Sequence, residues 1–373
     1  MTAFGLSDKQ EILLGEARRI GREHLAPMAA EGEPGRVNRP LVKALSEQGL
    51  LPRLFPEDSP VSAMDLCLLR EALAQESTEA ETALALQGLG AYPILQSGRD
   101  ELIRQWIPPV AKGEAVAAFA LTEAEHGSDA AALELTADRV TSGFRLTGTK
   151  AYISNAPEAD VYTLFARTTP DAGAKGVTAF VLPGDAPGLS GEPIALLAPH
   201  AIGKLELQDV HVPDENVLGE VDQGFPVAMR TLDLFRPSVG AFAVGMAQAA
   251  LDASVSHAGS RRSMGKLLRE HQAISQLLGE MVTRTEAARL LVYSAATAYD
   301  AEAPHVRRAS AMAKLFATET AQWVVDAAIQ VHGAAALEHG HLLEHLYREV
   351  RAPRIYEGTS EIQREIIARE LYR

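Results

Sequence analysis

The spacing of hydrophobic residues divides the chain into three parts of different character. In the first part, apolar residues recur every three or four positions, as they do along the buried face of an amphipathic helix. Ser7 followed by Gln10 forms a capping-box pattern at the start of the first such run. Further helices are expected over residues 41–50, 64–76, 83–97 and 100–111. We therefore predict an N-terminal helical domain over residues 1–116.

The middle part loses this helical spacing. Short segments with alternating or β-branched residues appear instead, separated by glycine and proline, which is typical of strands joined by turns. Strands are expected over residues 144–147, 161–166, 177–182 and 205–212. Helices of useful length do not alternate with them, which argues against a doubly wound parallel sheet. Residues 117–223 are predicted to form a β-barrel or sandwich domain.

The last part returns to helical spacing in longer, alanine-rich and leucine-rich runs. The runs cover residues 239–258, 271–299, 306–332 and 360–371. Long neighbouring helices of this kind form bundles. Residues 224–373 are therefore predicted to form a C-terminal four-helix bundle, and the whole chain is predicted to have an α+β fold that is mainly α.

Composition narrows the class of protein. Hydrophobic residues make up 47% of the 373 residues and charged residues 23%, which are ordinary globular values. The formal net charge is −14, so binding to nucleic acid or to an anionic membrane is not expected. Cys67 is the only cysteine, which excludes an intramolecular disulfide. The sequence shows no leader pattern and no apolar run near 20 residues, so we expect a cytoplasmic protein without membrane insertion.

A histidine cluster near the C-terminus is the one candidate for a metal site. His341 and His345 are four positions apart and would share a face of a helix, and His339 lies close by. The usual His-Glu-x-x-His pattern is absent, and Glu338 and Glu344 are more simply solvated partners. No metal is expected here.

The segment 119–129 carries hydroxyl groups, a glycine and three acids where helices give way to strands. Small polar residues at such a junction suit the close approach of a ligand to the backbone. The alternative is a capped loop, in which Ser128 or Asp129 caps the alanine-rich turn that follows. On local grounds alone the capped loop is favoured.

The segment 354–364 offers a candidate base. Ser360 and Gln363 form a capping-box pattern, so a helix is expected to start there. Glu357 lies just before it beside Tyr356, and a carboxylate among apolar groups has a raised pKa, which suits a base. The alternative, a glutamate that only favours the helix dipole, is equally supported by the local pattern.

Five motifs, taken in order, resemble the acyl-CoA dehydrogenase flavoproteins over about residues 6–371. They are Phe119–Asp129, Tyr152–Asn155, Arg261–Gly265, Glu270–Ile274 and Ile355–Gln363. The order of helical, β and helical parts also matches that family. The resemblance implies an oxidoreductase that uses FAD as its cofactor.

The resemblance also implies which residues bind FAD. From one subunit they would be Phe119, Leu121, Thr122, Ser128, Tyr152, Ile153, Ser154, Thr359 and Glu361. Residues that would reach the FAD of a neighbouring subunit are Arg261, Ser263, Met264, Gln272, Gln330, Gly333 and Ala334. A homotetramer or dimer is therefore expected, with electron-transfer flavoprotein as the electron acceptor.

The implied reaction is α,β-dehydrogenation of an acyl thioester, from acyl-CoA to trans-2-enoyl-CoA, in fatty acid or amino acid catabolism. Glu357 would remove the α-proton while the β-hydrogen leaves as hydride to flavin N5. The family's alternative position for the base is Phe235 here, which cannot accept a proton. Substrate-binding positions would be Ser128, Asp233, Arg236 and Gly358.

Several departures from the family pattern leave other functions open. The Gly-Gly-x-Gly after Gln330 reads Gly333-Ala-Ala-Ala336, where a left-handed alanine would cost about 1 kcal/mol or more. The alternatives are dehydrogenation of a carrier-protein-bound acyl group, a flavin oxidase or monooxygenase, and a non-catalytic scaffold. A rough alignment places Glu81 in the acyl pocket, so a dicarboxylic substrate is disfavoured.

Overall fold

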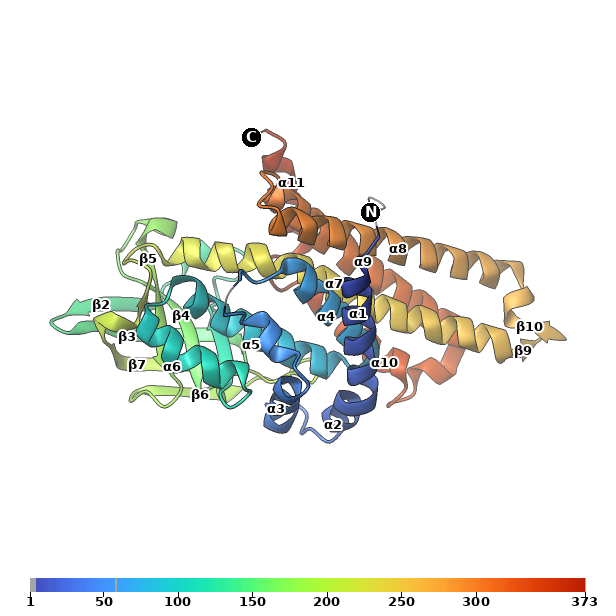
Figure 1. The fold of residues 1–373 in the computed structure, drawn as a ribbon, viewed down its shortest axis with the longest axis horizontal. Coiled ribbons are helices and arrows are strands. Elements are labelled where there is room, and N and C mark those ends of the chain that lie inside the picture. The colour runs from blue at the N-terminus through green and yellow to red at the C-terminus, as the bar shows by residue number, and fades with distance from the viewer. Residues whose placement is uncertain (1–4, 58, 373) are drawn as a thin grey trace. The chain divides into compact units, whose positions relative to one another are not determined.

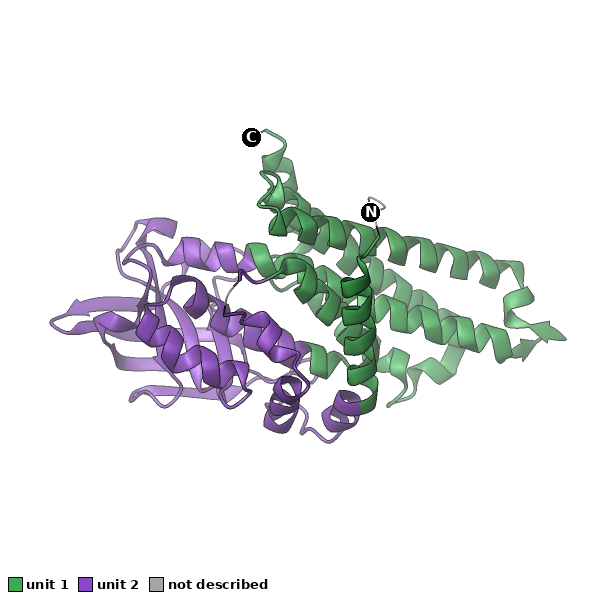
Figure 2. Ribbon diagram, in the orientation of Figure 1, with its two compact units in different colours: residues 1–23, 62–81, 233–373 green, residues 24–61, 82–232 purple. Residues whose placement is uncertain are grey.

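The chain forms two compact units in a computed structural model that describes residues 5–57 and 59–372. Figure 2 shows the first unit, residues 1–23, 62–81 and 233–373, in green and the second, residues 24–61 and 82–232, in purple. The divisions between them fall near the start of α5 (Thr78–Ser97) and within α7 (Gly224–Ser260). The predicted order of helical, β and helical parts is confirmed (Figure 1). The predicted boundaries after residues 116 and 223 stay predictions.

The first unit is helical. Besides most of α7, it contains α1 (Asp8–Ile20), α4 (Ala63–Glu76), α8 (Gln272–Asp300), α9 (Val306–His332), α10 (Leu342–Glu349), α11 (Ser360–Glu370) and the small hairpin of β9 (Arg262–Ser263) and β10 (Lys266–Leu267). Helix α8 packs against α9 and α4, and α10 and α11 pack against α9. Helix α4 is buried on nearly all sides, so its charged residues Arg70 and Glu71 lie inside the unit.

The second unit is built on a β-sheet. Its strands are β1 (Ala117–Ala120), β2 (Thr136–Val140), β3 (Gly143–Ser154), β4 (Val161–Arg167), β5 (Val177–Pro183), β6 (Leu189–Pro193), β7 (Ile202–Val212) and β8 (Val217–Leu218). They are ordered β6-β7-β3-β2-β4-β5-β8, and β1 pairs with β4 in parallel. Helices α2 (Ala26–Ala30), α3 (Arg39–Glu47), α5 and α6 (Asp100–Ala111) belong mainly to this unit.

The hydrophobic core of the second unit is formed mainly by side chains of the sheet. Phe144, Leu146, Tyr162 and Phe180 are almost fully buried in it, and the rings of Phe144 and Phe180 meet edge to face at 5.2 Å. The four predicted strands lie within β3, β4, β5 and β7, and these predictions are confirmed. The sheet places the ends of β1 and β3, which carry two of the motifs, side by side through the bond from Ala151 N to Thr122 O at 3.0 Å.

Among the residues that the structure describes, one helix is long and apolar enough to cross a membrane. It is α7, in which 78% of the most apolar window is buried inside the protein. A core helix can be equally long and apolar, so this is weak support for a membrane span. The sequence interpretation predicted residues 239–258 of this helix and left out its first part, because it placed the helix start at residue 239.

Candidate active site

Glu357 lies in a tight turn that joins a short 3-10 segment (Ala352–Arg354) to α11. Its backbone is left-handed, with φ 53°, and Gly358 follows with φ 93°. A non-glycine residue in this region is strained by roughly 1–2 kcal/mol. Glycine is required next, because a Cβ on Gly358 would lie 2.6 Å from Nε2 of Gln363. The turn is therefore a specific conformation that the surroundings must hold.

Three side chains from three helices hold the carbonyl groups of this turn. Arg236 Nε of α7 donates to Glu357 O at 3.2 Å, and Lys314 Nζ of α9 donates to Gly358 O at 2.7 Å. Gln363 Nε2 of α11 donates to both carbonyls, at 3.1 and 3.0 Å. The turn is thereby tied to the core of the helical unit.

Helix α11 starts at Ser360 as predicted, but its cap differs from the predicted one. The predicted capping box of Ser360 and Gln363 is wrong, because Thr359 is the N-cap and its side chain accepts from Ile362 N. Ser360 instead donates to Glu319 at 2.6 Å, and the Gln363 amide is committed to the turn before the helix. Thr359 satisfies a free helix donor, which leaves Gln363 available to fix the position of Glu357.

The Glu357 carboxylate is poised to accept a proton. Its Oε2 atom is buried and has no hydrogen-bond partner. Burial raises the pKa of Glu357, while the positive charges of Arg70, Arg236 and Lys314 oppose that rise. A desolvated carboxylate with a free oxygen, whose ionised form is favoured by nearby cations, is suited to general base catalysis.

The predicted substrate positions in this unit surround the same turn. Arg236 is buried and its Nη1 lies 3.5 Å from Asp233 Oδ1, while Gly358 follows Glu357 directly. The structure thus brings together three of the four predicted substrate positions with the predicted base. Asp233 also accepts from Arg307 Nε at 3.4 Å, which anchors it to the start of α9.

Glu81, which the sequence alignment placed in the acyl pocket, is paired with a buried arginine. It is 1% exposed and forms an ion pair with Arg70 Nε, and Arg70 is itself 4% exposed. Arg70 Nη1 also donates to Ser238 Oγ at 2.7 Å. The charge of Arg70 acts on both Tyr356 and Glu357, so the pair belongs to the surroundings of the candidate base. Sequence reasoning missed Arg70, although an arginine within the apolar run from Leu66 to Ala74 is a detectable signal.

The first flavin motif is braced in the second unit by a buried lysine. Lys150 Nζ donates to Leu121 O at 3.0 Å and to Glu123 Oε1 at 2.8 Å. Glu123 also accepts from the backbone amides of Glu134 and Leu135. Asp129 stands at the N-cap position of the turn 130–132 but makes no side-chain cap bond, so the capped-loop alternative is wrong for Asp129.

The other residues of this unit that were predicted to bind flavin differ in exposure. Tyr152 is 54% exposed and has a left-handed φ of 57°, while Ile153 beside it is buried. Thr122 and Ser154 are half-buried and present hydroxyl groups, and Ser128 is exposed. Leu121 is buried, and the Phe119 ring lies 5.0 Å from that of Phe165. This unit therefore offers two hydroxyl groups and an exposed aromatic ring near the paired ends of β1 and β3.

The positions predicted to serve a neighbouring subunit lie at the end of α7, in the β9–β10 hairpin, at the start of α8 and at the end of α9. The stacked rings of His257 and His332, 4.2 Å apart, hold the ends of α7 and α9 together. The residues concerned are all exposed: Arg261, Ser263, Met264, Gln272, Gln330, Gly333 and Ala334. The left-handed residue of the altered loop is Gly333, with φ 69°, and the alanines after it continue in a 3-10 segment (Gly333–Leu337). The strain considered for those alanines does not arise.

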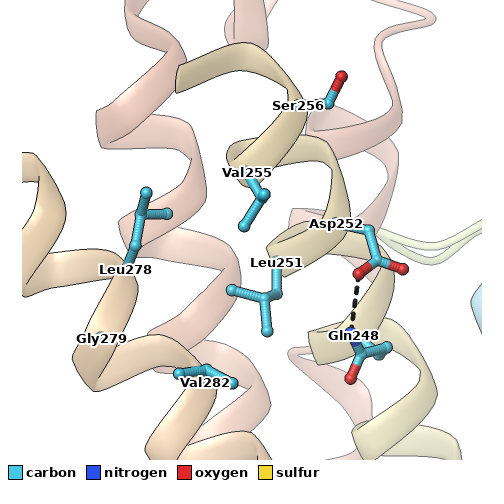
Figure 3. A pocket seen from close by; sticks show the side chains of 8 residues that line it. All are labelled: Gln248, Leu251, Asp252, Val255, Ser256, Leu278, Gly279 and Val282. Carbon is cyan, nitrogen blue, oxygen red and sulfur yellow. Dashed lines mark hydrogen bonds between the residues drawn. The ribbon is translucent and has the colours of Figure 1, made fainter. Parts of the chain in front are cut away.

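Two other features lie apart from the predicted site. His345 bonds to Thr78, His341 caps α10 and the exposed His339 contacts Glu344, so the three histidines have separate partners. Across residues 5–57 and 59–372, no group of three metal-ligating side chains could hold an ion. A hollow of about 610 Å³ between α7 and α8, lined by Leu251, Val255, Leu278 and others (Figure 3), includes none of the predicted site residues.

Comparison with known proteins identifies the family. Three family models match in order: Acyl-CoA dehydrogenase N-terminal domain at residues 7–114, middle domain at 118–210 and C-terminal domain at 222–372. Cyclohexane-1-carbonyl-CoA dehydrogenase of Geobacter metallireducens is 34% identical over 99% of this chain and 98% of its own length. Butyryl-CoA dehydrogenase from Megasphaera elsdenii has a TM-score of 0.94 at 33% identity, covering 100% of both chains. The FAD complex of PigA has a TM-score of 0.93 at 27% identity, covering 100% of this chain and 99% of PigA. The resemblance found in the sequence is confirmed, and the chain belongs to the acyl-CoA dehydrogenase family of oxidoreductases.

Proposed function

We propose that this chain converts an acyl-CoA thioester to the trans-2-enoyl-CoA, with Glu357 as the base that removes the α-proton. The observation that carries the proposal is the buried, unpartnered Oε2 of Glu357 in a left-handed turn held by three helices. A residue serving only the fold would not be expected to combine a strained backbone with an unsatisfied buried oxygen. Family membership supplies the reaction class.

FAD is the cofactor, in keeping with family membership and with the FAD complex of the related PigA. The second unit suits such a group, because Thr122 and Ser154 present hydroxyl groups near an exposed Tyr152 ring at the braced ends of β1 and β3. When bound, FAD supplies the acceptor for the hydride equivalent that leaves the β-carbon. Phe119, Leu121, Ile153, Thr359 and Glu361 complete the proposed set from the same chain.

The residues of the helical unit perform the proton chemistry. The Glu357 carboxylate takes the α-proton, and the electron pair of that C–H bond becomes the new C=C bond as the β-hydrogen leaves. The charges of Arg70, Arg236 and Lys314 favour the ionised form of Glu357, the form that accepts the proton. We assign Ser128, Asp233, Arg236 and Gly358 to the thioester and its pantetheine arm.

We propose that the FAD site is shared between subunits of a dimer or tetramer. In one chain the positions Arg261, Ser263, Met264, Gln272 and Gln330 are exposed, and Met264 is 92% exposed at the tip of the β9–β10 hairpin. Side chains presented in this way are available to a second copy of the chain. Electron-transfer flavoprotein is the proposed acceptor of the electrons.

The test is a panel of acyl-CoA and acyl-carrier thioesters with the purified yellow protein. Anaerobic mixing with a substrate should bleach the flavin absorbance, and a dye acceptor should restore it. Oxygen consumption without the dye would indicate an oxidase, and absence of bound flavin would contradict the proposal. Glu357→Gln should bind FAD and thioester but bleach at least about 10²-fold more slowly.

A further inference from the structure

Lys314 is a buried lysine to which neither the sequence motifs nor the family resemblance gave a role. Its side chain is 0% exposed in the middle of α9, a place where lysine is rare unless it has a partner. Its ammonium donates to Gly358 O at 2.7 Å, and its charge acts on the neighbouring Glu357. The buried lysine therefore binds the turn that carries the candidate base.

We propose that Lys314 is a positioning residue for proton abstraction, which fixes the left-handed turn that carries Glu357. This inference rests on the proposed function, in which Glu357 is the base. The turn has two successive left-handed residues, Glu357 and Gly358, and such strain persists only where the surroundings determine it. Lys314 ties the Gly358 carbonyl to α9, while Arg236 ties the preceding carbonyl to α7. The two anchors come from different helices, so together they resist rotation of the turn.

The positive charge of Lys314 differs from those of Arg70 and Arg236, because each arginine lies beside an acid. Arg70 is paired with Glu81, and Arg236 lies 3.5 Å from Asp233, whereas the 2.7 Å partner of Lys314 is a neutral carbonyl. Other charged and titratable groups act on Glu357, on Lys314 or on their immediate partners. They are Arg70 of α4, Glu81 of α5, Asp233 and Arg236 of α7, Arg307 and Glu319 of α9, Glu361 of α11 and Tyr356. Loss of the Lys314 charge therefore leaves Glu357 less favoured in its ionised form.

Loss of the Lys314 charge should change how the reaction depends on pH. Glu357 acts as a base only when ionised, and the Lys314 charge lowers its pKa. Removal of that charge raises the pKa, so the acid limb of kcat/KM moves to higher pH. A lysine that only filled space in α9 would leave this limb where it is.

The experiment compares three variants by anaerobic flavin bleaching with butyryl-CoA across pH. Lys314→Met keeps the length but removes the charge and donors, and Lys314→Arg keeps both. Lys204→Met is the control, because Lys204 is an exposed lysine paired with exposed Glu192. We expect Lys314→Met to bleach about 10- to 100-fold more slowly at pH 7, as for a misplaced catalytic group, with its acid limb shifted upward. Lys314→Arg should restore the position of the limb, and Lys204→Met should match the unmutated protein.

A second readout does not depend on turnover. Infrared difference titration of the FAD-loaded protein without substrate follows the Glu357 carboxyl, which is assigned by the signal that Glu357→Gln loses. Its midpoint should be higher in Lys314→Met than in the unmutated protein. If Lys314→Met does not fold, Lys314→Gln makes the same comparison, since it keeps a donor and lacks the charge.

Two results would overturn the inference. One is an unchanged midpoint and an unchanged bleaching rate in the uncharged variant. The other is a slower rate with an unmoved midpoint, which would make Lys314 a support of the fold alone. If Glu357→Gln bleaches as fast as the unmutated protein, the proposed function fails, while the infrared titration still decides whether Lys314 controls Glu357.

Discussion

Two buried lysines, each beside a glutamate, serve different ends in the two units. In the second unit, both oxygens of Glu123 are satisfied by Lys150 and two backbone amides, and these contacts lower its pKa. In the first unit, Lys314 donates to a carbonyl, Glu357 keeps one buried oxygen without a partner, and burial raises its pKa. Burial lowers the pKa of both lysines to about 8. The difference lies in whether the carboxylate is fully bonded, and it separates a structural brace from a reactive group.

The largest effect is expected for substitution of Glu357, the glutamate with the unpartnered oxygen. Glu357→Gln should lower the rate of flavin bleaching by about 10²- to 10⁴-fold, the range for losing a general base. The free energy of unfolding should not fall, because the change removes a buried charge and breaks no hydrogen bond of Oε2. Stopped-flow bleaching and urea unfolding measure the two quantities. Equal bleaching rates would place the base elsewhere.

Glu123→Gln, in contrast, should lower the free energy of unfolding. It leaves the buried Lys150 without its carboxylate, and breaking such a pair costs about 3–5 kcal/mol. Urea unfolding followed by circular dichroism measures the loss. The control is Glu192→Gln, which breaks an exposed pair with Lys204 and should change the free energy of unfolding by less than about 1 kcal/mol. Similar losses of unfolding free energy in both variants would show that the Lys150–Glu123 pair does not stabilise the segment 119–129.

The fold followed from the sequence wherever periodicity was strong. The helices α6 and α9 begin and end at the predicted residues, and the capping box at Ser7 is present. The start of α7 was missed because Pro237 suggests a break, yet the helix continues through it. Strands β1 and β2 were missed because their alanine-rich and polar residues carry little β-propensity.

The candidate site was only partly predictable. Glu357 was found because Gly358 and a helix start follow it, a pattern that local chemistry can interpret. Lys314 and Arg70 were missed because their roles depend on residues distant in the sequence. Gln363 was assigned to a capping box, whereas its amide binds the turn five and six residues before it. Lys314 does carry a signal, since it lies on the same helical face as the buried alanines Ala311 and Ala317. A charged residue on an apolar helix face indicates a buried charge that needs a partner elsewhere in the fold.

A third buried pair, Arg70 and Glu81, should affect which acyl thioesters the protein accepts. Arg70 is already engaged by Glu81 and Ser238, so a second carboxylate from a glutaryl thioester would find this cation occupied. Burying an unpaired charge costs several kcal/mol. We expect turnover of glutaryl-CoA to be at least about 10²-fold below that of butyryl-CoA, measured as kcat/KM with a dye acceptor. Comparable turnover would show that the acyl tail does not reach this pair.

The smallest effects, those of pH on stability, should differ in sign between the two glutamates. The pKa of Glu123 is lowered on folding, so its contribution to stability is present above about pH 4.5 and is lost as the pH falls through its folded pKa. The pKa of Glu357 is raised, so the folded protein loses stability as the pH rises from about 4.5 through its folded pKa. Each unit of either shift is worth about 1.4 kcal/mol.

Urea unfolding of the two glutamine variants at several pH values isolates these contributions. The destabilisation caused by Glu123→Gln should shrink as the pH falls below about 4.5, whereas the advantage of Glu357→Gln over the unmutated protein should grow as the pH rises above it. The comparison is kept below about pH 8, the folded pKa of both lysines, so that the charge of the lysines changes little across it. Parallel pH dependence in the two variants would mean that both carboxylates are bonded alike, and Glu357 would then lose its distinction as the reactive one.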